Sequence, residues 1–358
     1  MITPNLYIDL HVLQTVPSAN LNRDDTGAPK TALYGGVTRA RVSSQSWKRA
    51  VRQGFKAENI TAGIRTKEAA QLLIDQLMKL DGDLDEKNAL EKAIEVFKAA
   101  GIKIDKKTNE TGALLLVSRG QIEKLAQYAL SNVDLSKKEI KKVLKSDQSL
   151  DLALFGRMVA DNPELNVDAS TQVAHAISTH EVVPEYDYFT ALDDLQPKNN
   201  AGAAMLGSLE FNSSTLYRYA NVNVNELIYN MDIDSGITGA VAFIKEFLLT
   251  MPSGKQNTFA NKTLPSYVMI NLRTDTPVNL VSAFEEPVRS KDGYLRKSIE
   301  KFEKEFEASG QYLDMPELNV VLSKFETNTG VRVANLSELL QRVTAGLKEA
   351  IQNEDVND

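Results

Sequence analysis

Residues 39–52 read Arg-Ala-Arg-Val-Ser-Ser-Gln-Ser-Trp-Lys-Arg-Ala-Val-Arg, and this stretch predicts a strand that turns directly into a helix. Ala40–Val42 suits a short strand, and either Ser43 or Ser44 can cap a helix from about Gln45 to Lys56. The apolar face of that helix holds Trp47, Ala50, Val51 and Phe55, and the opposite face holds Lys48, Arg49, Arg52 and Lys56. We therefore expect one face to be buried and the other to carry positive charge.

Positive charge is concentrated around this helix. Between Thr26 and Ala57 the chain has seven lysines and arginines and no carboxylate, although its formal charge is −7. A helix N-terminus attracts phosphate through its unpaired N–H groups, and Ser43, Ser44 and Gln45 would add side-chain donors. The window favours nucleic-acid binding, with no acid within reach. The alternative is an ordinary solvated helix face, although such faces usually mix both signs of charge.

The composition limits the class of protein. At 358 residues, two domains or one domain with a large insertion are expected. The absence of cysteine excludes disulfides, zinc–cysteine sites and iron–sulfur clusters. Residues 1–20 lack the pattern of a signal peptide, and no apolar stretch is long enough to span a bilayer. We expect a cytoplasmic protein without membrane contact.

The pattern of apolar residues predicts an α+β fold. Strands are expected at Leu6–Thr15 and at residues 215–224 and 267–272. Helices are expected at residues 66–80, 87–100, 136–145, 239–251, 294–308 and 336–351. Because a helical block lies between strand-containing ends, the N- and C-terminal segments are expected to share one sheet.

Three further segments carry weaker signals. Ile102–Ile104 and Leu114–Val117 are expected to pair as a small hairpin. Asp168 is expected to cap a helix that carries Val173, Ala176 and Ile177. The weakly hydrophobic, Gly-, Asn- and Ser-rich residues 193–214 predict a long protruding loop or hairpin.

A second group of cations lies on the helix that Ser136-Lys-Lys-Glu139 opens as a capping box. These lysines share one helical face: Lys137, Lys138, Lys141, Lys142 and Lys145. A solubilising face and loose contact with a polyanion are equally compatible with this spacing.

No catalytic or metal-binding motif stands out. His175 and His180 are five residues apart, whereas a helical metal pair needs a spacing of three or four, and His11 is distant in sequence. Asp193-Asp194 suits a turn better than a nuclease metal site. Phe189, Tyr217 and Tyr219 could stack on bases or anchor the long loop to the core, and both readings stay open. No metal or cofactor is expected.

Several motifs, in one order over nearly the whole chain, resemble the CasC-type backbone subunit of the type I-E CRISPR surveillance complex, Cascade. They are Leu21-Asn-Arg-Asp-Asp25, Gly35-Gly36, Arg41-Val-Ser-Ser-Gln-Ser46 with Lys48-Arg49, Gly156-Arg-Met158, Ala174-His-Ala-Ile-Ser-Thr-His180, Phe189-Thr-Ala191 with Asp193-Asp-Leu-Gln196, and Tyr217-Arg-Tyr-Ala-Asn221. The chain differs from some relatives at Val37-Thr38, and residues 161–168 and 197–205 are not closely matched, so no contacts are assigned there.

The resemblance implies a non-enzymatic protein shaped like a right hand. A palm with an RNA-recognition-motif (ferredoxin-like) fold would comprise residues 1–57, 174–188 and 220–358, with helical fingers at 58–173 and a thumb at 189–219. Copies would stack head to tail along the CRISPR RNA, kink it at intervals and present it to target DNA in antiviral defence. Further partners would be the large, small, guide-end-binding and RNA-processing subunits.

The resemblance also implies which residues contact nucleic acid. Those on the guide backbone would be Arg23, Lys30, Ser43, Ser44, Gln45, Lys48, Arg49 and Arg52. Met158, Phe189 and Thr190 would flank the kink. Lys137, Lys138, Lys141, Lys142 and Lys145, with Arg289 and Lys291, would meet the target DNA duplex. Related type III backbone subunits cut RNA with a thumb aspartate, so an endoribonuclease using Asp193 or Asp194 is the alternative.

Overall fold

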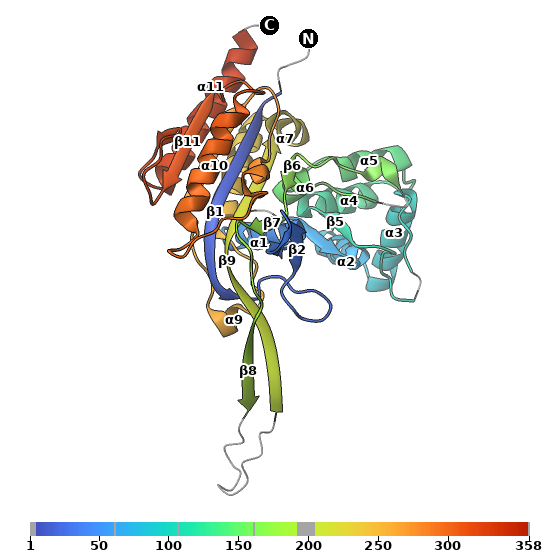
Figure 1. The fold of residues 1–358 in the computed structure, drawn as a ribbon. Helices are drawn as coiled ribbons and strands as arrows, with labels where there is room; N and C mark the ends of the chain where they lie inside the picture. The colour runs from blue at the N-terminus through green and yellow to red at the C-terminus, as the bar shows by residue number, and fades with distance from the viewer. Residues whose placement is uncertain (1–4, 61, 106, 160–161, 192–204, 357–358) are drawn as a thin grey trace, which may run out of the picture. The chain divides into compact units, whose positions relative to one another are not determined.

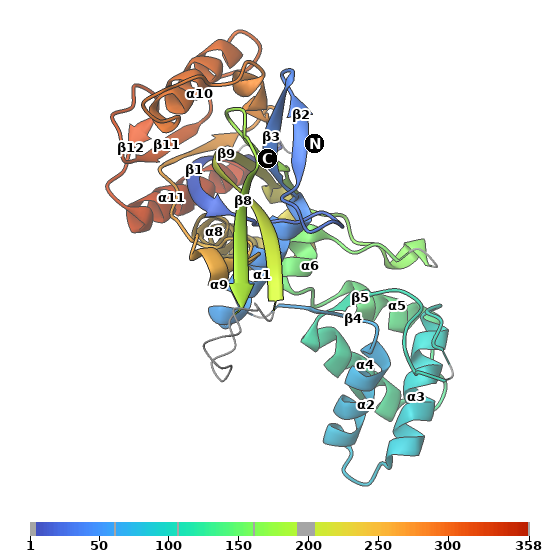
Figure 2. The same cartoon turned by 60° about the horizontal axis from the view of Figure 1, so that its bottom comes forward.

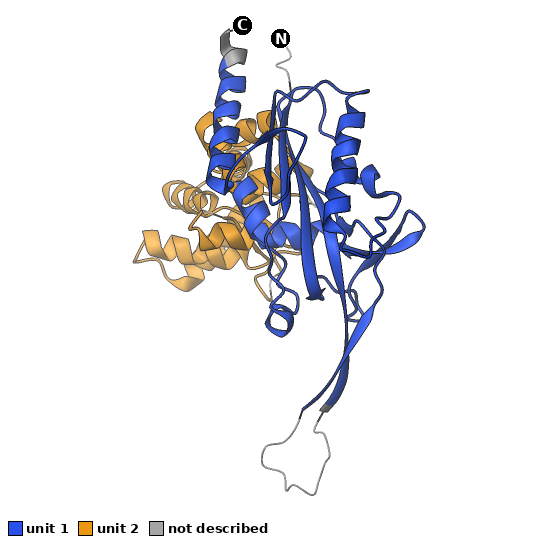
Figure 3. Cartoon of the chain, turned by 60° about the vertical axis from the view of Figure 1, so that its left-hand side comes forward, with its two compact units in different colours: residues 1–51, 173–221, 243–358 blue, residues 52–172, 222–242 orange. Residues whose placement is uncertain are grey.

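The chain folds into two compact units (Figure 3). The computed structural model describes residues 5–60, 62–105, 107–159, 162–191 and 205–356. Unit 1 comprises residues 1–51, 173–221 and 243–358, and unit 2 comprises residues 52–172 and 222–242. Within the described ranges, no helix is long and apolar enough to cross a membrane.

Unit 1 is built on a large, mainly antiparallel sheet (Figure 1). Its strands follow the order β12-β11-β10-β1-β9-β7-β3-β2. The bounds are β1 Tyr7–Ala19, β2 Thr31–Tyr34, β3 Val37–Val42, β7 Ala176–Ser178, β9 Met205–Asn223, β10 Tyr267–Arg273, β11 Leu318–Ser323 and β12 Val331–Arg332. Since β1 pairs with β10, from Tyr7 opposite Arg273 to Leu13 opposite Tyr267, the predictions of an α+β fold and of a sheet shared by both chain ends are confirmed.

Helices cover both faces of this sheet. His11 and Leu13 of β1 point to the face on which α10 (Leu295–Ser309) packs, with Phe302 in the shared core. On the opposite face, α11 (Leu336–Val356) brings Gly346 against Leu272 of β10. Alternation along the strands therefore supplies two apolar surfaces, as expected for a strand buried on both sides.

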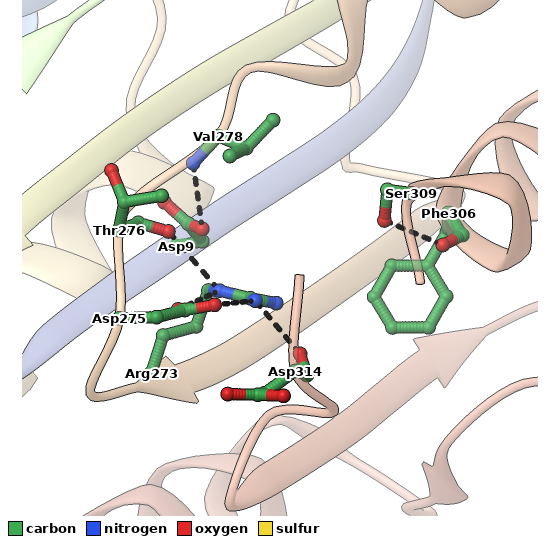
Figure 4. A network of polar contacts seen from close by, with 8 residues as sticks. All are labelled: Asp9, Arg273, Asp275, Thr276, Val278, Phe306, Ser309 and Asp314. Carbon is green, nitrogen blue, oxygen red and sulfur yellow. Dashed lines mark hydrogen bonds and ion pairs between the residues drawn. The ribbon is translucent and has the colours of Figure 1, made fainter. Parts of the chain in front are cut away.

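A network of polar contacts connects β1, the end of β10 and the loop that follows β10 (Figure 4). Asp9 is buried and accepts hydrogen bonds from the Tyr219 hydroxyl at 2.6 Å and the Val278 backbone N–H at 3.1 Å. Arg273 donates to both carboxylate oxygens of Asp275, at 2.8 and 2.6 Å. Burial raises the pKa of Asp9 to about 6, although its hydrogen bonds and Arg273 act in the opposite direction.

The helix expected after Asp168 is absent, and this prediction is wrong. Residues 171–173 and 176–178 are instead the short strands β6 (Thr171–Val173) and β7. All three residues of β7 are buried because the strand lies between β3 and β9. A run of three apolar residues is too short to distinguish the periodicity of a helix from that of a strand. The conformation of residues 176–178 is therefore set by pairing with two strands that are distant in sequence.

Unit 2 gathers helices around a separate apolar core (Figure 2). Its elements are β4 Ile64–Thr66, α2 Ala69–Leu80, α3 Glu86–Ala99, β5 Leu115–Val117, α4 Arg119–Ser131, α5 Lys137–Lys145, α6 Leu150–Phe155, the 3-10 turn η1 Pro163–Leu165 and α7 Val224–Asn230. The expected hairpin is wrong: Leu115–Val117 pairs with β4, and Ile104 only bridges to Thr111. The partner strand lies about fifty residues upstream, so local sequence does not reveal it.

The remaining helices are α1 Ser44–Ala57, α8 Ile233–Leu249, α9 Gln256–Phe259 and the 3-10 helix η2 Leu280–Phe284. A two-stranded ribbon, formed by β8 (Glu185–Ala191) and the first residues of β9, extends from the sheet of unit 1. Glu185 lies opposite Phe211 and Ala191 opposite Met205. This pairing confirms a hairpin in the segment that was expected to protrude, although its tip lies outside the described residues.

Candidate nucleic-acid interface

The start of α1 is tied to the loop that precedes β2. Ser43 is buried, and its backbone N–H donates to Asn22 Oδ1 at 2.9 Å. The Ser43 carbonyl accepts the first bonds of the helix, from Ser46 N at 3.0 Å and Trp47 N at 3.3 Å. The first turn of α1 contains no acidic side chain. Within that turn, Gln45 is exposed and Ser44 is half-buried. The helix N-terminus therefore presents donors, although Ser43 itself is largely covered.

The cationic face of α1 contains two kinds of residue. Arg49 is exposed, whereas Lys48 is half-buried and burial lowers its pKa. Arg52 donates from Nε to the buried carboxylate of Asp151 at 2.6 Å and from Nη2 to the Gly63 carbonyl at 3.2 Å. The expectation that no acid lies within reach of this face is therefore wrong at Arg52, because a residue 99 positions later supplies one.

The loop before β2 has a defined backbone conformation. Asp24 Oδ1 accepts from the Thr26 hydroxyl at 2.7 Å, the Thr26 N–H at 2.9 Å and the Ala28 N–H at 3.1 Å. These bonds, the one from the hydroxyl above all, lower the pKa of Asp24. Lys30 N donates to the Asn22 carbonyl at 2.8 Å. Asn22 thus contacts both the backbone beside Lys30 and the start of α1. The exposed Arg23 and the half-buried Lys30 are placed beside that helix N-terminus.

Arg39 belongs to the interior. It is fully buried and donates to the carbonyl oxygens of Tyr34 at 3.1 Å, Ser178 at 2.9 Å and Phe284 at 2.8 Å. Its guanidinium therefore joins β3, β7 and η2. Among the seven cations of the window, the side chains of Arg39, Arg41 and Arg52 all have hydrogen-bond partners inside the protein.

The residues predicted to flank a kink belong to both units. Phe189, 39% exposed, lies on the ribbon across from Gly207, and Thr190 is exposed beside it. A Cβ at position 207 would approach Phe189 Cζ to 2.4 Å, so any other residue there would require the ring to shift. Met158 is 83% exposed and belongs to unit 2. Its role with Phe189 and Thr190 stays a prediction.

The lysines of α5 form an exposed face of this helix in unit 2. Ile140 and Leu144 are buried on one side, and four lysines are exposed on the other: Lys137, Lys138, Lys142 and Lys145. Lys141 is ion-paired with Glu164, which lowers the pKa of that carboxyl. In unit 1, Arg289 and Lys291 are exposed. Their contact with target DNA stays a prediction.

Two histidines and the two tyrosines that flank Arg218 belong to the core of unit 1. His11 is buried with Nδ1 2.9 Å from the Tyr217 hydroxyl, and burial lowers its pKa to about 3. His180 is buried and stacks on Tyr294 with ring centroids 3.6 Å apart. Tyr217 and Tyr219 are buried, so the anchoring reading is correct for them and the base-stacking reading is wrong.

The part of the chain that the structure describes contains no candidate metal-binding site. No group of three or more His, Cys, Asp or Glu side chains within those ranges could hold a metal ion. Asp193 and Asp194, the residues of the nuclease alternative, lie outside the described residues.

Sequence reasoning missed the residues that hold this interface in place. In the sequence, Asn22 and Arg218 stand out only as members of the motifs Leu21-Asn-Arg-Asp-Asp25 and Tyr217-Arg-Tyr-Ala-Asn221. The Arg218 guanidinium is stacked between Trp47, 3.8 Å from the ring centroid, and Phe247, 4.4 Å from its centroid. Burial of an arginine lowers its pKa, here to about 9. The spacing of Tyr217-Arg-Tyr219 in a strand could have indicated that Arg218 faces the side opposite to both tyrosines.

The chain is similar to one protein family and to chains of solved structures. A family model described as CT1975-like protein matches residues 8–346. A chain of the solved structure "CRISPR RNA-guided surveillance complex, pre-nicking" is 32% identical, with a TM-score of 0.85, and the match covers 95% of this chain and 100% of that chain. A chain of "CRISPR RNA-guided surveillance complex" is 28% identical, with a TM-score of 0.75 and coverage of 95% and 99%. No curated protein matches the chain.

Proposed function

The chain belongs to the CT1975-like protein family, and from this premise we propose that it is an RNA-binding backbone subunit of a CRISPR RNA-guided surveillance complex. Its partners are the CRISPR RNA and the other subunits of that complex. The resemblance of its motifs favours a type I-E Cascade. The subunit acts as a scaffold without catalysis.

The observation that carries this proposal is the cationic surface around the N-terminus of α1. Arg23, Lys30 and Arg49 lie beside a helix start whose first turn has no acid. Their charges, together with the helix N-terminus, suit phosphates and carry no base specificity. Such a surface grips the backbone and leaves base edges available for pairing with a target.

The rest of the molecule takes the roles that this function needs. Unit 1 serves as an RNA-recognition-motif-like palm, unit 2 carries the fingers, and the β8–β9 ribbon is the base of the thumb. Copies associate head to tail along the guide, and a heterologous contact of this kind repeats until something caps it. Phe189, Thr190 and Met158 offset the stacking energy that a kinked guide loses.

Reversing the charge of two exposed arginines tests whether this surface binds the RNA backbone. We expect Arg23→Glu with Arg49→Glu to abolish copurified guide RNA and to weaken binding of a synthetic guide. Two lost phosphate contacts should reduce the slope of log K against log salt by about 1.4, from about 0.7 for each contact with a single strand. Fluorescence anisotropy between about 50 and 200 mM salt measures both quantities.

The matched control is Lys304→Glu with Lys348→Glu, which reverses two exposed lysines on α10 and α11. This variant should retain the guide. Equal RNA retention by both double variants would sink the proposal. The alternative function is tested by incubating the protein with a matched RNA and magnesium. Regularly spaced cuts that disappear in the Asp193→Ala or Asp194→Ala variant would show that the protein is an endoribonuclease and not a scaffold.

A further inference from the structure

Three basic side chains meet in unit 1 beside the start of α1: Lys30, Arg41 and His175. The backbone N–H of Arg41 donates to the Lys30 carbonyl at 2.9 Å, which places the two residues side by side. Arg41 Nη1 lies 3.2 Å from His175 Nδ1, and Arg41 Nε donates to the Thr31 carbonyl at 2.8 Å. His175 is exposed, and the two cations are half-buried.

The strand register places this group level with the helix start. Arg41 lies opposite Ile177 and Val42 opposite Ala176, so the next position along brings His175 level with Ser43. Asn22 accepts from Ser43 N and, through its carbonyl, from Lys30 N. The three side chains therefore form an extension of the cationic surface around α1, on the side of β3 and β7.

The cluster has positive charge without compensation. No carboxylate of the described residues makes an ion pair with Lys30, Arg41 or His175. The charged groups that face His175 are Arg41 from β3 and Lys30 from the loop before β2. Partial burial of the imidazole, and then the charges of Arg41 and Lys30, lower the pKa of His175. Arg41 can donate to His175 Nδ1 only while that nitrogen is unprotonated. This contact in the free protein therefore favours the neutral imidazole over the imidazolium.

We propose that Lys30, Arg41 and His175 form a subsite for a phosphate of the RNA backbone, in which His175 binds as the imidazolium. This inference rests on the proposed function and adds two residues to its RNA surface. In the complex the Arg41–His175 hydrogen bond is exchanged for bonds from both side chains to the phosphate oxygens. Charge-assisted bonds of this kind are shorter and stronger than neutral ones.

The exchange links RNA binding to proton uptake. A bound phosphate raises the pKa of His175 from its lowered value in the free protein. Between the free and bound pKa values, binding takes up one proton, so affinity rises as the pH falls. It rises by up to about tenfold per pH unit and levels off below the pKa of the free protein.

The experiment measures affinity for a short RNA from about pH 5.5 to 8 in the full chain. Wild type should bind more tightly as the pH falls. His175→Gln should bind with little pH dependence, and His175→Lys should combine high affinity with little pH dependence. Arg41→Gln should reduce the salt slope by about 0.7. Lys304→Gln, on an exposed face of α10, should behave as wild type.

An NMR titration gives a second readout that does not depend on affinity. The chain has only three histidines, and burial lowers the pKa of His11 and His180. A pKa of His175 that rises on addition of RNA supports the subsite. If RNA binds to wild type and is lost from the Arg23/Arg49 double variant, but His175→Gln keeps the wild-type pH dependence, the subsite is wrong and the proposed function stands. Failure of wild type to bind RNA would overturn both.

Discussion

At the scale of single residues, arginines that look equivalent in the sequence have different roles in the structure. Arg39, Arg49 and Arg52 lie within fourteen positions of one another and all contribute to the basic window. Arg49 is exposed, whereas Arg39 bonds to three carbonyl oxygens and Arg52 to Asp151. These partners come from distant segments, so charge counting predicted that an interface exists but not which cations are available for it.

Asp9 couples the stability of unit 1 to pH. Burial raises its pKa from 3.8 to about 6, so the folded state binds this proton more tightly than the unfolded chain. The contribution of Asp9 to stability is therefore full below about pH 4 and is lost as the pH rises to about 6. The interval of about two pH units corresponds to about 3 kcal/mol.

Asp9→Asn removes this titration and keeps one side-chain oxygen as an acceptor. We expect the free energy of unfolding of wild type, minus that of the variant, to fall by up to about 3 kcal/mol between about pH 4 and 7. Urea unfolding at a series of pH values measures this difference, and taking the difference cancels the other carboxylates. A difference that is constant over the series would contradict the raised pKa.

At the scale of elements, sequence periodicity identified most of the long helices, but it missed α4 and the short strand pairings. Ser118 and Gln121 form a capping box at α4, with Gln121 N donating to Ser118 Oγ at 2.9 Å and Ser118 N to Gln121 Oε1 at 3.1 Å. The capping box predicted at Ser136 is wrong, because Ser136 is the N-cap residue of α5 but its side chain makes no capping hydrogen bond. Both stretches match the pattern, so local packing, which the pattern does not contain, decides whether the bonds form.

The lysine face of α5 can be tested as one element. We expect Lys138→Glu, Lys142→Glu and Lys145→Glu together to weaken capture of target DNA by the assembled complex while guide RNA is retained, because these lysines are exposed and Lys141 already pairs with Glu164. Reversing three phosphate contacts with duplex DNA should reduce the salt slope by at least about 2.7. An unchanged slope and affinity would mean that the face only improves solubility.

At the scale of the whole molecule, the proposed head-to-tail assembly predicts a stoichiometry. If each copy covers a fixed length of guide, the number of chains bound to one RNA should increase in whole steps as the RNA is lengthened. Mass photometry on RNAs of graded length measures this number, and the Arg23/Arg49 double variant provides the control without bound chains. One chain per RNA at every length would instead indicate a free-standing RNA-binding module.

The stack of Arg218 between Trp47 and Phe247 makes the protein its own optical reporter. Trp47 is the only tryptophan in the chain, and a guanidinium lies 3.8 Å from the centre of its ring. All intrinsic tryptophan fluorescence therefore comes from one point, where the first turn of α1 rests on a side chain of β9. A change in its emission reports a disturbance of that contact without any attached dye.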